Sequence, residues 1–118
     1  MHPLIEQNIE KIQQLGQKHY LKSLFVFGSV ANGDFNDGSD VDFLHQIDYQ
    51  SFDFDHLETM PYNPNTEFYE LKNELEKLLK RKVDLIANQK FRNKYFQQSV
   101  EKSKFLIFSN ERFTKISG

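Results

Sequence analysis

The stretch Leu24-Phe25-Val26-Phe27-Gly28-Ser29, followed after ten residues by Asp40-Val41-Asp42-Phe43-Leu44, decides the fold of this chain. Each part contains an apolar run rich in strand-forming residues, so the pair predicts two short strands. The turn-forming residues Asn32-Gly33 and Asn36-Asp37-Gly38 lie between them. They predict a connecting loop over 29–39 with room for one helical turn.

Apolar periodicity predicts the other elements on either side of this pair. They are an amphipathic helix over about 4–18, a helix that starts at Asn65 or Thr66 and ends near Leu79, a strand over 82–86, a weaker helix over about 89–102, and a final apolar run at 105–108. Residues 48–65 show no sustained period and predict a long loop. This order indicates an α/β (α+β) fold, a small mixed sheet with helices packed mainly on one face.

Size and composition exclude several classes of protein. The chain has 118 residues and no cysteine, so we expect one domain over 1–118 without disulfides or thiolate metal sites. It contains no apolar stretch near the length of a membrane span, and we expect a cytoplasmic protein. A net charge of −2 gives no support to a general nucleic-acid binder.

Three aspartates form the candidate chemical centre. Asp40 and Asp42 are two positions apart, which in a strand puts both side chains on one face, about 6.6 Å apart. Asp84 lies in the otherwise apolar strand over 82–86, where burial of an unpaired carboxylate would cost several kcal/mol. Oxygen ligands of this kind suit magnesium, and paired carboxylates can bridge two ions about 3.5–4 Å apart. The pattern therefore predicts a divalent metal site.

The pair Gly28-Ser29 is the candidate phosphate-binding turn. A residue without a Cβ lets the backbone approach a phosphate, and Ser29 offers a backbone N–H and a hydroxyl. The sequence contains neither a Walker A motif nor a Gly-x-Gly-x-x-Gly motif. The common nucleotide-binding loops are therefore not the basis of this prediction.

The segments 24–34, 39–44 and 81–86 together resemble the minimal nucleotidyltransferase (MNT) family of the DNA polymerase β-like superfamily, over about residues 20–110. The resemblance implies a polymerase β-like palm. In it, Asp40, Asp42 and Asp84 would be catalytic and bind two magnesium ions, and Gly28, Ser29 and Ser39 would bind the nucleotide. The implied reaction transfers a nucleoside monophosphate from a triphosphate, with ATP expected, to an acceptor hydroxyl.

The resemblance also leaves alternatives open. Similar proteins often carry arginines just after the glycine-serine pair, where this chain has Val30 and Asn32, so a degenerate nucleotide-binding domain is one alternative. Such domains are often encoded beside a HEPN-type helical protein, and some are antitoxins that adenylylate it. An antitoxin or regulatory module with a HEPN-type partner is the other. The acceptor, the base preference and the oligomeric state, including a homo-oligomer, stay open.

Two further features favour ordinary structural roles. Asp53-Phe54-Asp55 repeats the Asp-x-Asp spacing, but it lies in the predicted long loop without a preceding glycine-serine turn, and a solvated loop is the simpler interpretation. The histidines at positions 2, 19, 45 and 56 have no partner at metal-ligand spacing. We expect surface or packing roles for them, with attention to His45 because it follows the Asp-x-Asp strand.

Overall fold

The computed structural model describes residues 2–33, 35–36, 38–47, 64–87 and 91–110. The predicted loop over 48–65 lies outside the described residues except for positions 64 and 65, which are part of a helix. The Asp53-Phe54-Asp55 motif and His56 also lie outside them.

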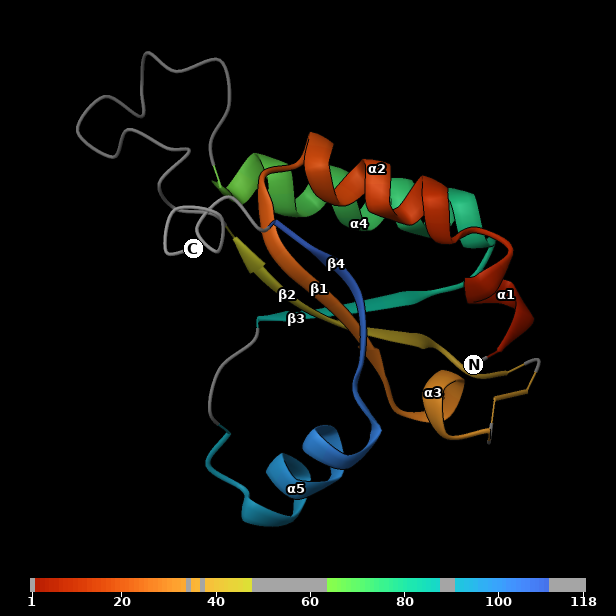
Figure 1. Cartoon of the computed structure of the whole chain (residues 1–118), viewed down its shortest axis with the longest axis vertical. Helices are drawn as coiled ribbons and strands as arrows, with labels where there is room; N and C mark the ends of the chain where they lie inside the picture. The colour runs from red at the N-terminus through yellow and green to blue at the C-terminus, as the bar shows by residue number, and fades with distance from the viewer. Residues whose placement is uncertain (1, 34, 37, 48–63, 88–90, 111–118) are drawn as a thin grey trace, which may run out of the picture.

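Four strands form one mixed sheet in the order β3-β2-β1-β4 (Figure 1). They are β1 (Leu21–Phe27), β2 (Val41–Ile47), β3 (Val83–Ala87) and β4 (Phe105–Ser109). Strand β1 is antiparallel to both β2 and β4, whereas β2 and β3 run parallel. The mixed α+β sheet expected from the sequence is confirmed.

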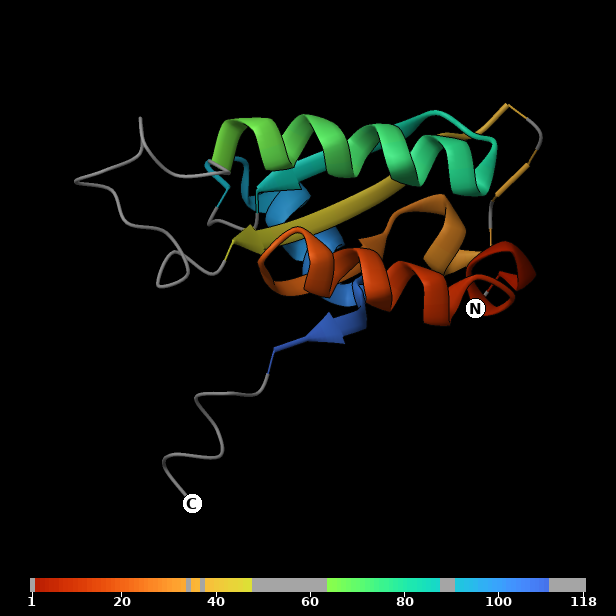
Figure 2. The same cartoon turned by 90° about the horizontal axis from the view of Figure 1, so that it is seen from above.

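Two helices, α2 (Ile9–Lys18) and α4 (Pro64–Leu79), cover one face of this sheet and run in opposite directions (Figures 1 and 2). Their apolar stripes bury against alternate strand residues, which is how an amphipathic helix covers a sheet. The core of this layer includes Ile12, Leu71, Leu75 and Leu79 from the helices and Leu24, Val26, Val41, Phe43 and Val83 from the strands.

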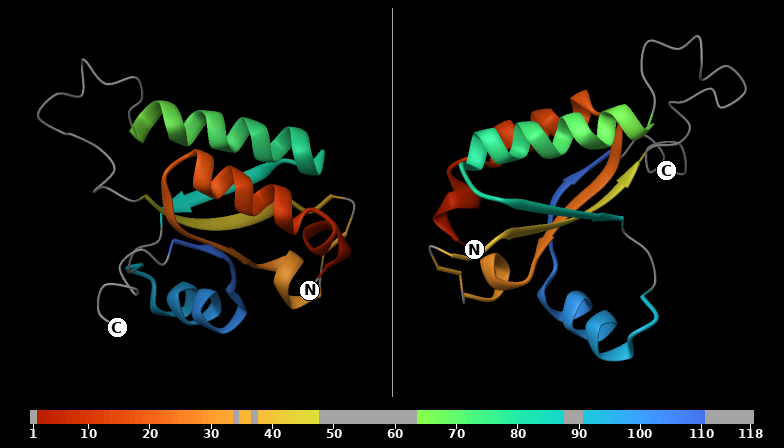
Figure 3. Two further views of the ribbon diagram at one scale, coloured as in Figure 1. Left: turned by 45° about the horizontal axis from the view of Figure 1, so that its top comes forward. Right: turned by 180° about the vertical axis from the view of Figure 1, so that it is seen from behind.

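The remaining helices lie elsewhere. Helix α5 (Lys94–Ser103) lies on the side of the sheet away from α2 and α4 (Figure 3). Its Val100 packs in a second, smaller cluster with Phe27 of β1 and Leu44 of β2. Helix α3 (Ser29–Asn32) is the single helical turn that follows β1.

The structure corrects three predicted boundaries. The helix predicted over 4–18 is two helices, α1 (Pro3–Glu6) and α2, separated at Gln7–Asn8. Helix α5 begins at Lys94 because the Asn93 side chain accepts two backbone N–H bonds and caps it there. Strand β2 begins at Val41, so Asp40 precedes the strand.

The described residues contain no helix long and apolar enough to cross a membrane.

Candidate active site

Asp42 and Asp84 lie directly opposite each other on the parallel strands β2 and β3. Neighbouring strands are about 4.8 Å apart, so their side chains share one region of the sheet. Both point to the α5 side, since their neighbours Val41 and Val83 are buried beneath α2 and α4 and successive strand residues face opposite ways. The structure therefore brings the second and third sequence candidates together.

The crowding of carboxylates is visible in the pKa of Asp42. Partial burial, followed by the nearby charges of Asp84 and Asp40, raises this pKa from 3.8 to about 6. Asp40 thus acts on the same site from the residue before β2. Three mutually repelling carboxylates form an oxygen donor set that suits a hard divalent cation.

Asp84 is exposed, which corrects the expectation that its carboxylate is buried in an apolar strand. Its side chain lies on the face of β3 that α2 and α4 leave uncovered. The burial instead falls on Asp42, which is half-buried. The two side chains share a face but differ in burial, because β3 is at the edge of the described sheet whereas β2 lies between β3 and β1, whose following Gly28 is close to Asp42.

Gly28 lies beside this centre because Phe27, at the end of β1, is the register partner of Asp42. Its backbone has a positive φ of 72°, a conformation that L side chains rarely adopt. A Cβ at this position would lie 2.6 Å from Oδ2 of Asp42. The glycine-serine turn predicted to hold phosphates is therefore next to the aspartates, and its glycine is required by space as well as by backbone geometry.

Helix α5 holds this turn in place. The backbone N–H of Gly28 donates to Ser103 Oγ at 3.3 Å, and the same hydroxyl donates to the Ser99 carbonyl at 2.9 Å. Ser103 was missed by the sequence reasoning, since a serine at the end of an amphipathic helix carries no local signal of a contact 75 residues away. Because Gly28 N–H is engaged, donors toward a phosphate at this turn would come from Ser29.

The loop before Asp40 is braced from two sides. Ser39 Oγ accepts the backbone N–H of Asn36 at 3.0 Å, so the candidate nucleotide-binding hydroxyl also stabilises its own turn. Arg81, just before β3, donates from Nη1 to the Asn36 carbonyl at 3.2 Å and lies 4.8 Å above the centre of the Phe35 ring. Arg81 therefore connects the loop that precedes Asp40 with the start of β3.

Val30 directly follows the glycine-serine pair, where the resemblance led us to expect an arginine. It is 2% exposed and packs in the main core. The Asn32 side chain lies outside what the structure describes.

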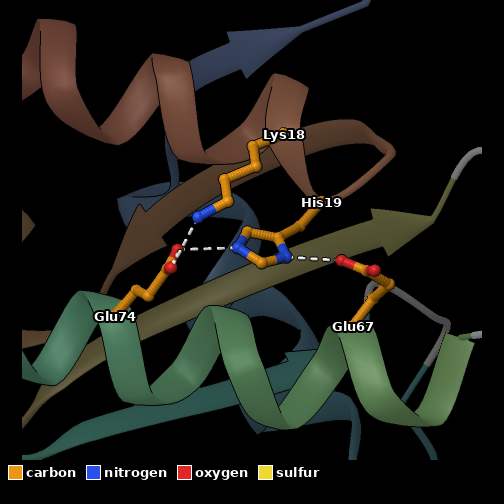
Figure 4. A network of polar contacts seen from close by, with 4 residues as sticks. All are labelled: Lys18, His19, Glu67 and Glu74. Carbon is orange, nitrogen blue, oxygen red and sulfur yellow. Dashed lines mark hydrogen bonds and ion pairs between the residues drawn. The ribbon is translucent and has the colours of Figure 1, made fainter. Parts of the chain in front are cut away.

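A second polar cluster lies on the opposite layer, between the end of α2 and the side of α4 (Figure 4). The ring nitrogens of His19 meet Glu67 at 2.5 Å and Glu74 at 2.7 Å, and Lys18 Nζ lies 2.7 Å from Glu74. The Lys18 ammonium, followed by the His19 ring, lowers the pKa of Glu74. This cluster joins the two helices.

The cluster also bears on where a metal could bind. Among the described residues, the ligand atoms of His19, Glu67 and Glu70 lie within 4.8 Å of one another, whereas the three aspartates form no group that tight. However, His19 already has a carboxylate oxygen at each ring nitrogen, so both nitrogens have a partner. The aspartates repel one another, as the raised pKa of Asp42 indicates, and a bound cation would reduce this repulsion.

His45 has a packing role, as expected from the sequence. It is buried on the α4 side of β2, its Nδ1 lies 3.0 Å from the Ile86 carbonyl, and burial lowers its pKa. Its ring lies 5.4 Å from that of Phe68, centre to centre. It faces away from Asp42.

The sequence matches the family model described as "Polymerase beta, Nucleotidyltransferase" over residues 10–113. The chain belongs to the polymerase β nucleotidyltransferase family. The match includes Gly28-Ser29 and all three aspartates, so this nucleotidyltransferase carries its candidate site within the family region.

Two proteins of Methanocaldococcus jannaschii that bear the name "Putative protein adenylyltransferase" are similar to this nucleotidyltransferase. One is 34% identical over 87 residues, which cover 74% of this chain and 77% of the relative. The other is 34% identical over 97 residues, which cover 80% of this chain and 85% of the relative.

Solved structures share the fold. A "putative minimal nucleotidyltransferase" superposes with a TM-score of 0.62 at 23% identity, covering 86% of this chain and 90% of that one. A toxin-antitoxin structure with AMP-PNP superposes with a TM-score of 0.60 at 20% identity, covering 92% of this chain and 79% of that one. A structure of a tri-AMPylated Shewanella oneidensis HEPN toxin in complex with an MNT antitoxin superposes with a TM-score of 0.55 at 18% identity. The match covers 94% of this chain and 77% of that one.

Proposed function

We propose that this nucleotidyltransferase transfers AMP from ATP to a hydroxyl group of an acceptor protein, with two magnesium ions held by Asp40, Asp42 and Asp84. The observation that carries the proposal is the meeting of Asp42 and Asp84 in register beside the Gly28-Ser29 turn. Relatives named as protein adenylyltransferases support AMP as the transferred group and a protein as the acceptor.

Each site residue has a distinct role in this proposal. Half-buried Asp42 and its neighbours Asp40 and Asp84 would together hold the ions through their carboxylate oxygens. When bound, magnesium supplies positive charge that offsets the negative charge on the phosphate oxygens. Ser29 donates from its backbone N–H and hydroxyl to the β- and γ-phosphates, and Ser39 lines the same end of the sheet.

The chemical step is an in-line substitution at the α-phosphorus. A bond forms from the acceptor oxygen to the α-phosphorus, and the bond from that phosphorus to the bridging oxygen of the β-phosphate breaks. Pyrophosphate leaves with the bonding electrons. The proton of the acceptor hydroxyl passes to the carboxylate of Asp84, whose exposure lets it exchange the proton with water.

The test separates nucleotide binding from transfer. Titration calorimetry with a non-hydrolysable ATP analogue, with and without magnesium, compares the wild type with Asp40→Asn plus Asp42→Asn and with the control Glu10→Gln, an exposed acid on α2. Magnesium-dependent binding in the wild type and the control, lost in the double variant, is expected. Equal binding by all three would refute the assignment of the aspartates.

Transfer is followed with ATP labelled at the α-phosphate, with any HEPN-type protein that is encoded beside this chain as the acceptor. Label on that protein, absent with the double Asn variant, is expected from the enzyme. Tight magnesium-dependent nucleotide binding without any transfer would instead identify the degenerate domain.

A second candidate function is that of an antitoxin that acts by binding a HEPN-type toxin. It is favoured by structural neighbours that are toxin-antitoxin complexes. Co-purification of the two proteins, with the toxin still neutralised by the double Asn variant, would support binding alone. Loss of neutralisation in that variant would support AMP transfer as the means of control.

A further inference from the structure

Exposed apolar side chains concentrate on one part of the molecule. In the described part of the chain, five large apolar or aromatic side chains are exposed, and four of them lie on α5 and β4. They are Tyr95 (83% exposed), Phe96, Phe105 (54%) and Leu106. A grouping of this kind on a small protein usually marks a contact surface.

The same region is positively charged, although the chain as a whole is acidic. Residues 91–106 contain four basic residues and one acid, so this stretch has a net charge of +3, while the whole chain has −2. Arg92, Lys94 and Lys102 are exposed, and Lys104 pairs with Glu101. We call Arg92, Lys94, Tyr95, Phe96, Lys102 and Leu106 the α5–β4 surface; Phe105 is the register partner of Val26 and lies on the other face of the sheet.

This surface adjoins the aspartate site. Ser103 at the end of α5 holds the Gly28 N–H, and the Phe96 ring lies 6.3 Å from that of Phe27, centre to centre, in an edge-to-face arrangement. Helix α5 lies on the face of the sheet to which Asp42 points. A molecule bound to the α5–β4 surface therefore lies next to the turn where the nucleotide phosphates are proposed to bind.

We infer that the α5–β4 surface docks the acceptor, and that the acceptor is a protein with an acidic face around an apolar patch. The inference rests on the proposed transfer to a protein hydroxyl. Aromatic anchors surrounded by arginine and lysine are typical of protein interfaces. The +3 charge favours an acceptor with an acidic surface, because electrostatic attraction then brings the hydroxyl of the acceptor to the site.

A protein fits this surface better than a nucleic acid does. Phosphate backbones are bound by many basic side chains, and this chain is acidic overall. Leu106 lies at the start of β4, a strand at the edge of the sheet in the described residues. An exposed apolar side chain on a sheet edge suits an apolar protein partner.

The test uses a defined acidic polypeptide, a fluorescent random copolymer of glutamate and tyrosine, with the full chain and no nucleotide. Fluorescence anisotropy compares the wild type with Lys94→Glu plus Lys102→Glu and with Tyr95→Ala. The control is Lys11→Glu plus Lys77→Glu, which makes the same charge change on exposed positions of α2 and α4. Because all of these side chains are exposed, every variant should fold.

We expect the α5 charge variant to bind about tenfold or more weakly, Tyr95→Ala several-fold more weakly, and the control within about twofold of the wild type. Equal weakening by the two charge variants would overturn the inference, because it would show an effect of net charge alone. Tighter binding of polycytidylate than of the copolymer would also overturn it in favour of a nucleic acid.

Label transfer from ATP to the copolymer separates this inference from the proposed function. If the copolymer binds through α5 but receives no label from the wild type, the docking surface stands and the transfer proposal fails for tyrosine hydroxyls. If label is transferred at the same rate by the wild type and by the α5 variants, transfer stands and the docking surface is wrong.

Discussion

Gly28 lies so close to Asp42 that a Cβ on residue 28 would be only 2.6 Å from Oδ2 of the Asp42 carboxylate. The end of β1 and the start of β2 are thus adjusted to each other. Any side chain at position 28 must displace the central aspartate of the site.

Gly28→Ala should therefore abolish magnesium-dependent nucleotide binding while the protein still folds. The displaced carboxylate disrupts the donor set, and the positive φ adds a strain of about 1–3 kcal/mol. Calorimetry of nucleotide binding and urea denaturation measure the two effects separately.

Gly33→Ala is the matched control. Gly33 also has a positive φ, 93°, but a Cβ there meets nothing within 4 Å. It should show a similar loss of stability with nucleotide binding close to that of the wild type. Comparable loss of binding in both variants would mean that backbone strain, and not the clash with Asp42, is responsible.

Asp42→Asn should stabilise the protein without metal at neutral pH. The folded pKa of Asp42, about 6, lies above the ordinary 3.8, so between these values the folded protein binds more protons than the unfolded chain. This makes the contribution of Asp42 to stability fall as pH rises through that window. Discounted for partial exposure, the gain in Asp42→Asn at pH 7 is roughly 1 kcal/mol, and it vanishes below about pH 4.

Magnesium should stabilise the wild type, and this stabilisation should increase with pH. The ion binds the ionised carboxylates, so its effect on the melting temperature should be greater at pH 7 than at pH 5. Thermal denaturation at both pH values checks this, with Asp42→Asn as the variant that should lose the effect. A magnesium shift of equal size at both pH values would contradict the raised pKa of Asp42.

His19→Ala should destabilise the fold strongly without altering the aspartate site. It leaves Glu67, which is 9% exposed, without the ring that it contacts, and removal of one member of a buried pair costs about 3–5 kcal/mol. Urea denaturation measures the loss. Lys18→Ala, which removes the exposed member of the same cluster, should leave the midpoint nearly unchanged, because exposed pairs are screened by water.

Gly16→Ala should weaken the attachment of β4 to α2. A Cβ on Gly16 would lie 2.8 Å from Cδ1 of Phe108, so the ring must move. We expect an overpacking cost of about 2 kcal/mol, which exceeds the helix-forming advantage of alanine, about 1 kcal/mol, and leaves a net loss of roughly 1 kcal/mol. Denaturation in urea compares it with Gln17→Ala at the next, exposed position, which should be neutral or slightly stabilising. A stabilised Gly16→Ala protein would show that Phe108 adjusts freely.

Local patterns determined most of the elements. Apolar runs bounded by turn residues predicted β1 and β2, and the period of leucines predicted α4, because these signals come from residues a few positions apart. The spacing from Gly28-Ser29 to Asp40 and Asp42 is also local, and it was sufficient to propose these residues as a candidate site, which stays a prediction. The break between α1 and α2 was missed, since apolar periodicity continues through Gln7–Asn8 although the helix does not.

The sequence by itself determined which residue types and spacings the site contains and that a mixed sheet carries them. Only the tertiary structure decided that Asp84 stands opposite Asp42, that Asp42 and not Asp84 is half-buried, and that Ser103 of α5 supports Gly28. These facts depend on strand register and on the face that each helix covers. Both arise from packing between residues far apart in the chain, and a local pattern does not encode such contacts.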